Sequence, residues 1–246
     1  GGAKNIVSGY YSFVGGGYFN HASGIESTIG GGSENLAEGN DSFIGGGTLN
    51  YAAGHRAAIV GGSGNAANGS NSVACGGADN AAIGDFSFAA GRHSSAMHPG
   101  SFVWGDGWGT SLISSANDQF SCRASGGYRF FTNNTHTSGV TMAANGNSWV
   151  SVSDSTKKRN IRMTDTKSIL QKFSTLQIKD WEYTSEPEGI EHIGPMAQDF
   201  WNSFHLGSDS LGIATIDADG VVFAAVQELA KRNEELETRN EKLEAE

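Results

Sequence analysis

The sequence is poor in proline and cysteine, with three prolines and two cysteines among its 246 residues. So little proline beside 36 glycines excludes a collagen triple helix. The cysteines, Cys75 and Cys122, are too few for a disulfide framework, and we expect both to be small buried or half-buried fillers. The seven histidines lack the spacing of a zinc site, so the sequence predicts neither a metal nor another cofactor.

Positive charge and long apolar runs are also scarce. Lysine and arginine number 16 against 26 acidic residues, which gives a net charge of −10. This charge repels phosphate and anionic lipid, so we expect no nucleic-acid partner. No apolar run approaches the about 18 residues that span a bilayer, so we expect no membrane insertion in this fragment. The chain begins at Gly1 without methionine or an apolar leader, and we expect a piece of a longer protein.

Glycine and charge are distributed in opposite ways along the chain. Residues 1–110 hold 27 of the 36 glycines but only 10 of the charged residues, whereas residues 153–246 hold 29 of the charged residues. The contrast predicts three parts: a repeat region over 1–110, a β-rich neck over 111–152 and a charged domain over 153–246.

The first part is a sequence repeat with a period of fifteen, the step from Asn20 to Asn35. Its columns are asparagine at Asn20, Asn35, Asn50, Asn65 and Asn80; paired glycines from Gly16–Gly17 to Gly76–Gly77; alanine at Ala22, Ala37, Ala52, Ala67 and Ala82; and apolar side chains at Val14, Ile29, Ile44, Ile59 and Ala74. A helical hairpin repeat needs about twice this length. The period predicts a coil of two short strands and two turns, advancing about 4.8 Å per coil, with a hydrogen-bonded asparagine ladder. We expect six coils.

A coil of this kind encloses a thin core of alanine, valine and isoleucine. The larger Phe13, Phe43 and Phe88 need another surface, which predicts self-association. A phosphate-binding loop is disfavoured because no helix or Gly-Lys-Ser/Thr sequence follows the triple glycines. Calcium-binding and ice-binding repeats are disfavoured because no column is acidic or threonine-rich. Nor is there a convincing carboxylate pair for glycoside cleavage, and these four residues are expected to be surface charges: Glu26, Glu34, Glu38 and Asp41.

The pattern Ser-x-Ile-x-Gly-Gly-x-x-x-Asn-x-Ala-x-Gly, over residues 5–106, resembles the head repeats of trimeric autotransporter adhesins. The resemblance implies a left-handed parallel β-roll in which three chains share a core. Repeats of that family are commonly one residue shorter, and phage and bacterial fibres also contain them. A host-surface receptor or glycan is the implied kind of ligand, although the repeat does not specify one.

The rest of the chain is predicted to be β-rich and then α+β, which makes the fold mainly β with a C-terminal α+β module. Strand-like runs occupy 119–124, 128–132, 140–143 and 148–152 in the neck, and 178–183 and 190–193 beyond it. Helix-like runs occupy 166–173 and 196–204. A final helix, over about 219–246 with Asp219 as its N-cap, carries a heptad pattern typical of a coiled coil. Its d positions are Val222, Leu229, Leu236 and Leu243, and its a positions are Val226, Asn233 and Asn240.

Three motifs lie in order along the charged domain. They are Ser153-Asp154-Ser155-Thr156-Lys157-Lys158-Arg159-Asn160-Ile161, His192-Ile193-Gly194-Pro195-Met196-Ala197-Gln198-Asp199-Phe200 and Ile216-Asp217-Ala218-Asp219-Gly220. Together they resemble the intramolecular chaperone domain of endosialidase-type phage tailspikes and tail fibres. That family folds the preceding fibre as a trimer and then cuts itself off.

The resemblance implies Ser153 as the nucleophile, Lys158 as the general base, and a scissile bond between Val152 and Ser153. Lysine acts as a base only when neutral, which requires burial or nearby positive charge. Five positions is a poor same-face spacing on a helix, so we expect Ser153 on an extended segment before a turn.

One departure from the family pattern and two open alternatives accompany this assignment. Relatives usually carry an acidic residue where this chain has Arg159. His192 and Gln198 belong to the second motif, and a place in the site or an interface remains open beside a structural role. A plain reading of the first motif is a helix cap at Ser153 or Asp154 followed by a solvated basic turn.

The sequence therefore predicts a homotrimeric extracellular fibre segment, from a phage virion or a bacterial surface, with a self-cleaving chaperone. The alternative is an adhesive stalk in which the same domain is a permanent trimer cap. A tailspike enzyme acting on host polysaccharide is a third possibility and lacks a candidate carboxylate pair.

Overall fold

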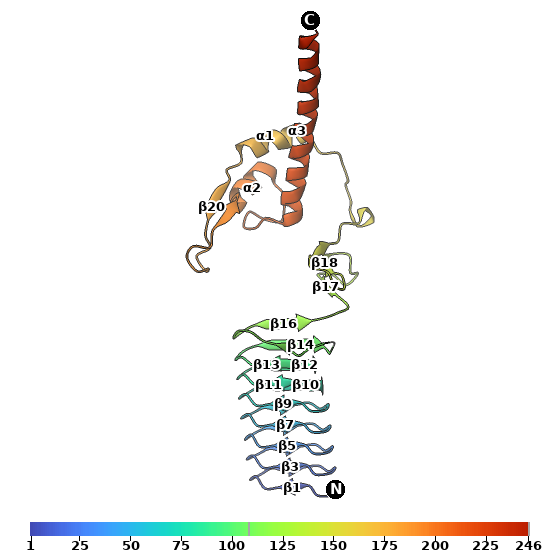
Figure 1. The fold of residues 1–246 in the computed structure, drawn as a ribbon, viewed down its shortest axis with the longest axis vertical. Helices are drawn as coiled ribbons and strands as arrows, with labels where there is room; N and C mark the ends of the chain where they lie inside the picture. Colours follow the sequence, from blue (N-terminus) through green and yellow to red (C-terminus); the bar gives the residue numbers. More distant parts are fainter. Residues whose placement is uncertain (108, 246) are drawn as a thin grey trace. The chain divides into compact units, whose positions relative to one another are not determined.

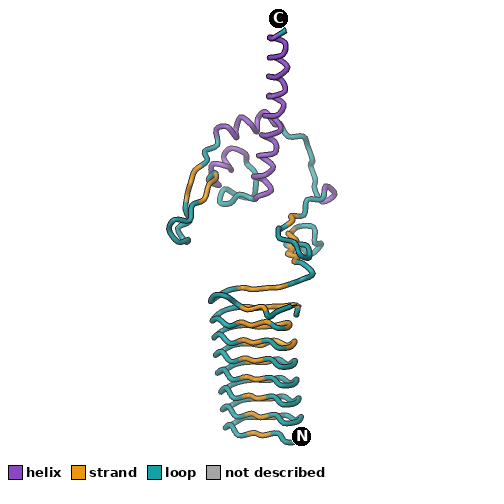
Figure 2. The backbone as a smooth tube through the Cα atoms, in the orientation of Figure 1, coloured by secondary structure: helices purple, strands orange, loops and turns teal. Residues whose placement is uncertain are grey.

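The computed structural model describes residues 1–107 and 109–245, which form two compact units, Gly1–Val150 and Ser151–Glu246. The N-terminal unit is a stack of flat coils followed by a small sheet, and the C-terminal unit is a group of helices with one hairpin (Figures 1 and 2). The boundary between the units lies within two residues of the predicted scissile bond.

The stack of coils is a β-solenoid with two parallel eight-stranded sheets. One sheet consists of β1 (Ile6–Val7), β3 (His21–Ala22), β5 (Leu36–Ala37), β7 (Tyr51–Ala52), β9 (Ala66–Ala67), β11 (Ala81–Ala82), β13 (Ser94–Ala96) and β15 (Leu112–Ile113). The other consists of β2 (Phe13–Val14), β4 (Thr28–Ile29), β6 (Phe43–Ile44), β8 (Ala58–Ile59), β10 (Val73–Ala78), β12 (Phe88–Arg92), β14 (Phe102–Asp106) and β16 (Phe120–Arg123). Each coil contributes one strand to each sheet (Figure 2).

The period of the sequence repeat is the register of these sheets. Ala22 pairs with Ala37, and Ile29 pairs with Ile44, so the predicted mainly β coil is confirmed. The strand pairing continues past residue 110 through β15 and β16, because parallel strands can still pair when the number of residues per coil changes. Phe88 pairs with Phe102 and Phe102 with Phe120, so the first step is one position shorter than the repeat and the second is three positions longer. The solenoid is therefore about eight coils long rather than the six predicted from the strict repeat.

The solenoid core is as thin as the sequence predicts. It consists of fully buried alanines with Ile29, Ile44, Ile59 and Val103. The outward phenylalanines differ in their surroundings. Phe88 stacks on Phe102 with ring centroids 4.7 Å apart, whereas Phe13 and Phe43 are 57% and 45% exposed. Within one chain, only part of this aromatic surface is covered.

The asparagine column forms a continuous buried ladder. Asn50 Oδ1 accepts hydrogen bonds from the backbone N–H of Asn65 at 3.0 Å and from its Nδ2 at 3.2 Å. Asn50 Nδ2 donates to the carbonyl oxygens of Gly46 at 2.9 Å and Gly62 at 3.0 Å. One side chain thus satisfies backbone groups in its own coil and in the next coil, which explains why a polar residue occupies a fully buried position.

Glycine is required at one corner of each coil, while other left-handed corners hold ordinary residues. Gly47 has φ +91°, and a Cβ there would overlap the backbone carbonyl of Gly62. Asp41 and Glu34 also have positive φ, at 57° and 56°. Their backbone N–H groups donate to carbonyls one coil earlier at 2.8 and 2.9 Å, and this pairing offsets a conformational cost of about 1 kcal/mol.

A buried serine column offers a test of how far the core tolerates unpaired hydroxyls. The hydroxyls of Ser27, Ser42, Ser72 and Ser87 are buried without a hydrogen-bond partner, and Ala57 occupies the same position in another coil. We expect Ser42→Ala to leave the free energy of unfolding unchanged or to raise it by up to about 1 kcal/mol. Ser101→Ala is the matched control, because the Ser101 hydroxyl donates to His98 O at 2.6 Å. Urea unfolding checks this, and a larger loss for Ser42→Ala than for Ser101→Ala would contradict it.

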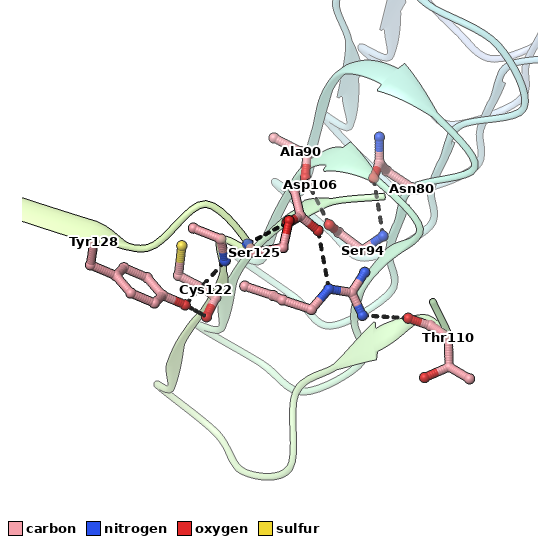
Figure 3. Close-up of polar contacts among 10 residues, drawn as sticks. Asn80, Ala90, Ser94, Asp106, Thr110, Cys122, Ser125 and Tyr128 are labelled. Carbon is pink, nitrogen blue, oxygen red and sulfur yellow. Dashed lines mark hydrogen bonds and ion pairs between the residues drawn. The ribbon is translucent and has the colours of Figure 1, made fainter. Parts of the chain in front are cut away.

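The last coil joins the neck through a polar cluster (Figure 3). Arg123 Nε pairs with Asp106 at 3.3 Å, and its Nη1 donates to Thr110 O. The Tyr128 hydroxyl donates to the backbone carbonyl of Cys122. Tyr128 begins the neck sheet, whose strands are β17 (Tyr128–Phe131), β18 (Gly139–Met142) and β19 (Val150–Ser151). These contacts fix the end of the solenoid where the repeat has been lost.

The two cysteines have different environments. Cys122 is half-buried, and burial raises the pKa of its thiol. Cys75 is exposed, so the prediction that it is a buried or half-buried filler is wrong. The reason is its column: Cys75 lies one repeat after Val60, which is 57% exposed, on the outer face of the coil.

The C-terminal unit contains a short 3-10 helix η1 (Ser155–Lys157), helices α1 (Thr166–Thr175), α2 (Ala197–Phe204) and α3 (Thr215–Glu244), and a hairpin of β20 (Lys179–Trp181) and β21 (His192–Gly194). Phe200, Phe204 and Val221 form its core with side chains from α1. The predicted helices and strands are therefore present. Asp219 is not the cap of the last helix, because α3 begins at Thr215, with Ala214 at the N-cap position.

Candidate active site

The turn after the neck brings Ser153 and Lys158 together. Lys158 Nζ donates a hydrogen bond to Ser153 Oγ at 2.8 Å. Asp154 makes the turn possible, because its Oδ1 accepts from the backbone N–H of Thr156 at 2.8 Å and so caps η1. The Lys158 backbone N–H then closes the turn on Ser155 O at 3.1 Å. Ser153 thus lies on extended chain before a tight turn, which suits a spacing of five positions.

The electrostatics of this turn are those of a solvated site. Ser153, Lys158 and the neighbouring Lys157 and Arg159 are all exposed in the single chain. The backbone N–H of Thr156 holds the pKa of the Asp154 carboxyl below its usual range, with a smaller contribution from Lys157. In this arrangement Lys158 is the hydrogen-bond donor. To accept a proton from the serine, it needs a less solvated environment.

The scissile bond suggested by the sequence lies two residues after the start of the C-terminal unit. Val152 is half-buried and follows β19, the edge strand of the neck sheet, and both Val152 and Ser153 belong to the C-terminal unit. Hydrolysis at this bond would leave the solenoid and neck strands on one fragment and the helices on the other. No core cluster of the described residues crosses the bond.

His192 and Gln198 lie elsewhere in the C-terminal unit. His192 is on β21, where its Nε2 contacts Glu186 Oε2 at 2.8 Å and its ring stacks on Trp181 with centroids 4.7 Å apart. Gln198 is exposed in the first turn of α2. Among the described residues, no hydrogen bond or ring contact joins either side chain to Ser153 or Lys158. The contacts of His192 are those of a residue that holds a hairpin together.

The heptad pattern alone would place Glu228 on an outer face of the last helix, yet this carboxylate is buried. Its residue is 2% exposed, and its oxygens accept from Thr166 Oγ1 at 2.7 Å and from Arg232 Nε at 3.4 Å. The Thr166 bond links the start of α1 to α3. The signal available in the sequence was spacing, because Val221, Ala225 and Glu228 recur along one helical face next to the heptad seam.

This buried carboxylate predicts acid sensitivity of the helical unit. The hydrogen bond from Thr166, followed by the bond from Arg232, holds the pKa of Glu228 below its usual range. The stabilisation is therefore complete above the pKa of an unfolded glutamate, about 4.3, and is lost as the pH falls through the lower pKa of the folded protein. We expect the stability difference between wild type and Glu228→Gln to be largest at neutral pH and to narrow below about pH 4. Thermal unfolding followed by helical circular dichroism measures it, and a constant difference at all pH values would contradict it.

The described residues do not group three or more histidine, cysteine or acidic side chains into a metal-binding cluster. Among the helices of the described part, none combines the length and apolar character needed to cross a membrane.

Comparison with known proteins finds a family match within the C-terminal unit. Residues 153–205 match a peptidase-family model described as the chaperone of endosialidase. The match begins at Ser153 and runs through the second motif to His205, just after α2. No curated protein matches the chain. The chain thus combines a β-solenoid, which fits the predicted head repeats, with a C-terminal segment that matches the model of the endosialidase chaperone.

Proposed function

We propose that this chain is a segment of a homotrimeric fibre whose C-terminal unit directs assembly and then releases itself by cutting between Val152 and Ser153. The observation that supports this proposal most directly is the 2.8 Å hydrogen bond between Lys158 Nζ and Ser153 Oγ, at the first residues of the family match. The family description supports a tail-fibre-type chaperone function. The exposed Phe13 and Phe43 of the solenoid, and the exposed heptad seam of α3, support association of copies.

The reaction is an intramolecular acyl transfer followed by hydrolysis. Neutral Lys158 accepts the proton of Ser153 Oγ as the oxygen attacks the carbonyl carbon of Val152. The C–N bond of the tetrahedral intermediate then breaks, the Ser153 nitrogen takes a proton from Lys158, and an ester joins Val152 to Ser153 Oγ. Water hydrolyses this ester, which frees the Val152 carboxylate and restores the serine hydroxyl. Each chain performs one turnover.

Assembly of the copies supplies the desolvated environment that Lys158 lacks in the single chain. Lys158 is exposed, and desolvation at a subunit interface, together with the positive charges of Lys157 and Arg159, would favour its neutral form. Cleavage then follows trimer formation instead of preceding it. The sequence of events suits a solenoid that can slip by one whole repeat, because the chaperone remains attached until the copies are aligned.

The test is the mass of the purified chain. Self-cleavage at the proposed bond gives the fragments 1–152 and 153–246, and Ser153→Ala keeps the chain whole. Fragments cut elsewhere, or cleavage that persists in Ser153→Ala, would contradict the assignment.

A second candidate function retains the C-terminal chaperone domain but involves no peptide-bond cleavage. Asp154 caps η1 and the basic side chains around it are solvated, which is also what a plain surface turn would show. In that case the chain is an adhesive stalk with a permanent trimer cap, and the wild type stays whole while assembled.

The fibre is proposed to act outside the cell, on a phage virion or a bacterial surface. The family description refers to a chaperone of endosialidase, which favours the tail-fibre setting. The receptor is a host-surface protein or glycan. Binding of the fibre fragment to host cells, compared before and after removal of surface glycans, distinguishes the two.

A further inference from the structure

The turn that joins Ser153 to Lys158 lies entirely on the C-terminal side of the proposed cut. Lys158 Nζ donates to Ser153 Oγ at 2.8 Å. The Thr156 N–H donates to Asp154 Oδ1 at 2.8 Å, and two backbone bonds close the same turn. Among the described residues, no recorded hydrogen bond ties this turn to an earlier part of the chain. Cleavage before Ser153 therefore removes none of these contacts, and the released fragment keeps the serine beside the lysine.

The cut also creates a base that the intact chain does not have. Before cleavage the nitrogen of Ser153 is a peptide amide, which does not accept a proton at neutral pH. After cleavage it is an α-amine, a group whose ordinary pKa is about 7.7–8.0. A neutral terminal amine activates the hydroxyl of its own residue in enzymes whose nucleophile is the first residue of the chain. In the released fragment this amine is separated from Oγ only by Cα and Cβ, so the base stays near the nucleophile whatever the packing of other elements.

The serine is accessible to other molecules once Val152 has left. Ser153, Asp154 and Lys158 are all exposed, so nothing within the chain covers the hydroxyl. The proposed cleavage needs a desolvated lysine, whereas a terminal amine acts as a base in water. Lys158 then only has to keep donating to Oγ, because this hydrogen bond stabilises the negative charge that develops on the attacking oxygen. An open site of this kind suits a small acyl donor that arrives from solution.

We propose that the released fragment, residues 153–246, accepts one acyl group from an activated ester or thioester at Ser153 Oγ and transfers it to its own α-nitrogen. The amine takes the Oγ proton as the oxygen attacks the acyl carbonyl, and it then gives a proton to the leaving alcohol or thiol. The nitrogen next attacks the new ester, the bond from the acyl carbon to Oγ breaks, and a proton passes from nitrogen to Oγ. The product is an N-acylated serine with a free hydroxyl, so each fragment reacts once. This activity rests on the proposed function only for the release of the fragment.

The test exposes Ser153 whether or not the chain cuts itself. A protease recognition sequence inserted after Val152 in the full chain allows cutting directly before residue 153, and p-nitrophenyl acetate at about pH 7.5 is the probe. We expect one acetyl group on residue 153, located by intact mass and peptide mapping of the C-terminal fragment. It should form at least about tenfold faster than on the matched Ser153→Ala fragment, whose amine can only attack the probe directly. Ser155→Ala is the control, because Ser155 is an exposed serine of the same turn whose hydroxyl has no recorded hydrogen bond among the described residues, and it should react like the unchanged fragment.

The pH profile and the lysine give two further readouts. The acetylation rate should rise between about pH 6.5 and 8.5 and then level off, because only the neutral α-amine acts as the base. Lys158→Ala in the same chain should slow acetylation at least about fivefold, because the bond to Oγ is lost.

Three results would overturn the acyl-transfer proposal. They are equal rates for the unchanged and Ser153→Ala fragments, acetyl groups confined to lysine side chains, and an unchanged rate in Lys158→Ala. A chain that never cuts itself, but whose protease-released fragment is acetylated at residue 153 as described, would support the acyl transfer and contradict only the proposed self-release.

Discussion

Lys158→Ala is expected to leave the full 246-residue chain uncut while it still assembles. The proposed reaction needs a group that takes the Ser153 proton, and Lys158 Nζ is 2.8 Å from that oxygen. Removal of a general base typically costs a factor of about 10² to 10⁴ in rate, which turns cleavage within minutes into cleavage within days. Intact mass measured over time after purification gives the rate directly.

Two further substitutions distinguish a general-base role of Lys158 from a role that depends only on its positive charge. Lys158→Arg keeps the charge but cannot lose its proton at accessible pH, so it should be as inactive as the alanine variant. Lys157→Ala is the matched control. It removes an adjacent cation that has no hydrogen bond to the serine, and we expect at most a modest slowing. Normal cleavage by Lys158→Arg would show that the lysine contributes only charge.

The pH dependence provides an independent check of the same role. A general base must be neutral to accept a proton, so the cleavage rate of an assembled wild type should increase with pH. An assembled chain whose cleavage rate is unchanged between about pH 6 and 9 would not fit a lysine base with a solvated resting state.

Asn50→Ala should be among the most destabilising single changes in the solenoid. It removes the acceptor for the Asn65 backbone N–H and the donor to the carbonyls of Gly46 and Gly62. Each buried group left unpaired costs about 1–3 kcal/mol, so we expect a total loss of about 3–6 kcal/mol. Hydrogen exchange should show the loss most clearly at the Asn65 amide.

Two other positions of the chain suggest a substitution that should partly restore stability and a matched control for this prediction. Ser94 occupies the same ladder position in a later coil, where its hydroxyl donates to Ala90 O at 2.7 Å and its backbone N–H donates to Asn80 Oδ1. Asn50→Ser should therefore recover part of the stability. Asn68 is exposed, and its side chain has no recorded hydrogen bond to the rest of the described chain, so Asn68→Ala should change stability by less than about 0.5 kcal/mol. Equal losses for Asn50→Ala and Asn68→Ala would show that the ladder does not hold the coils together.

The architecture of the solenoid could be predicted because its information is local and repeated. An asparagine and an alanine that recur once per repeat can both be buried in only one register, which is the observed pairing of Ala22 with Ala37. The end of the solenoid could not be predicted in the same way. Strands β15 and β16 extend the sheets across irregular steps, and the cluster of Asp106, Arg123 and Tyr128 that closes them joins residues with no periodic relation.

The sequence by itself determined the repeating coil, and a family resemblance added Ser153 and Lys158 as a candidate dyad. Tertiary structure decided what surrounds them. It exposed Cys75, buried Glu228 on a helix face that the heptads assign to solvent, and separated His192 from the dyad by giving it aromatic and carboxylate neighbours of its own. The physical reason is that periodicity reports which side of an element is apolar. Which neighbour covers that side depends on contacts between residues far apart in the chain.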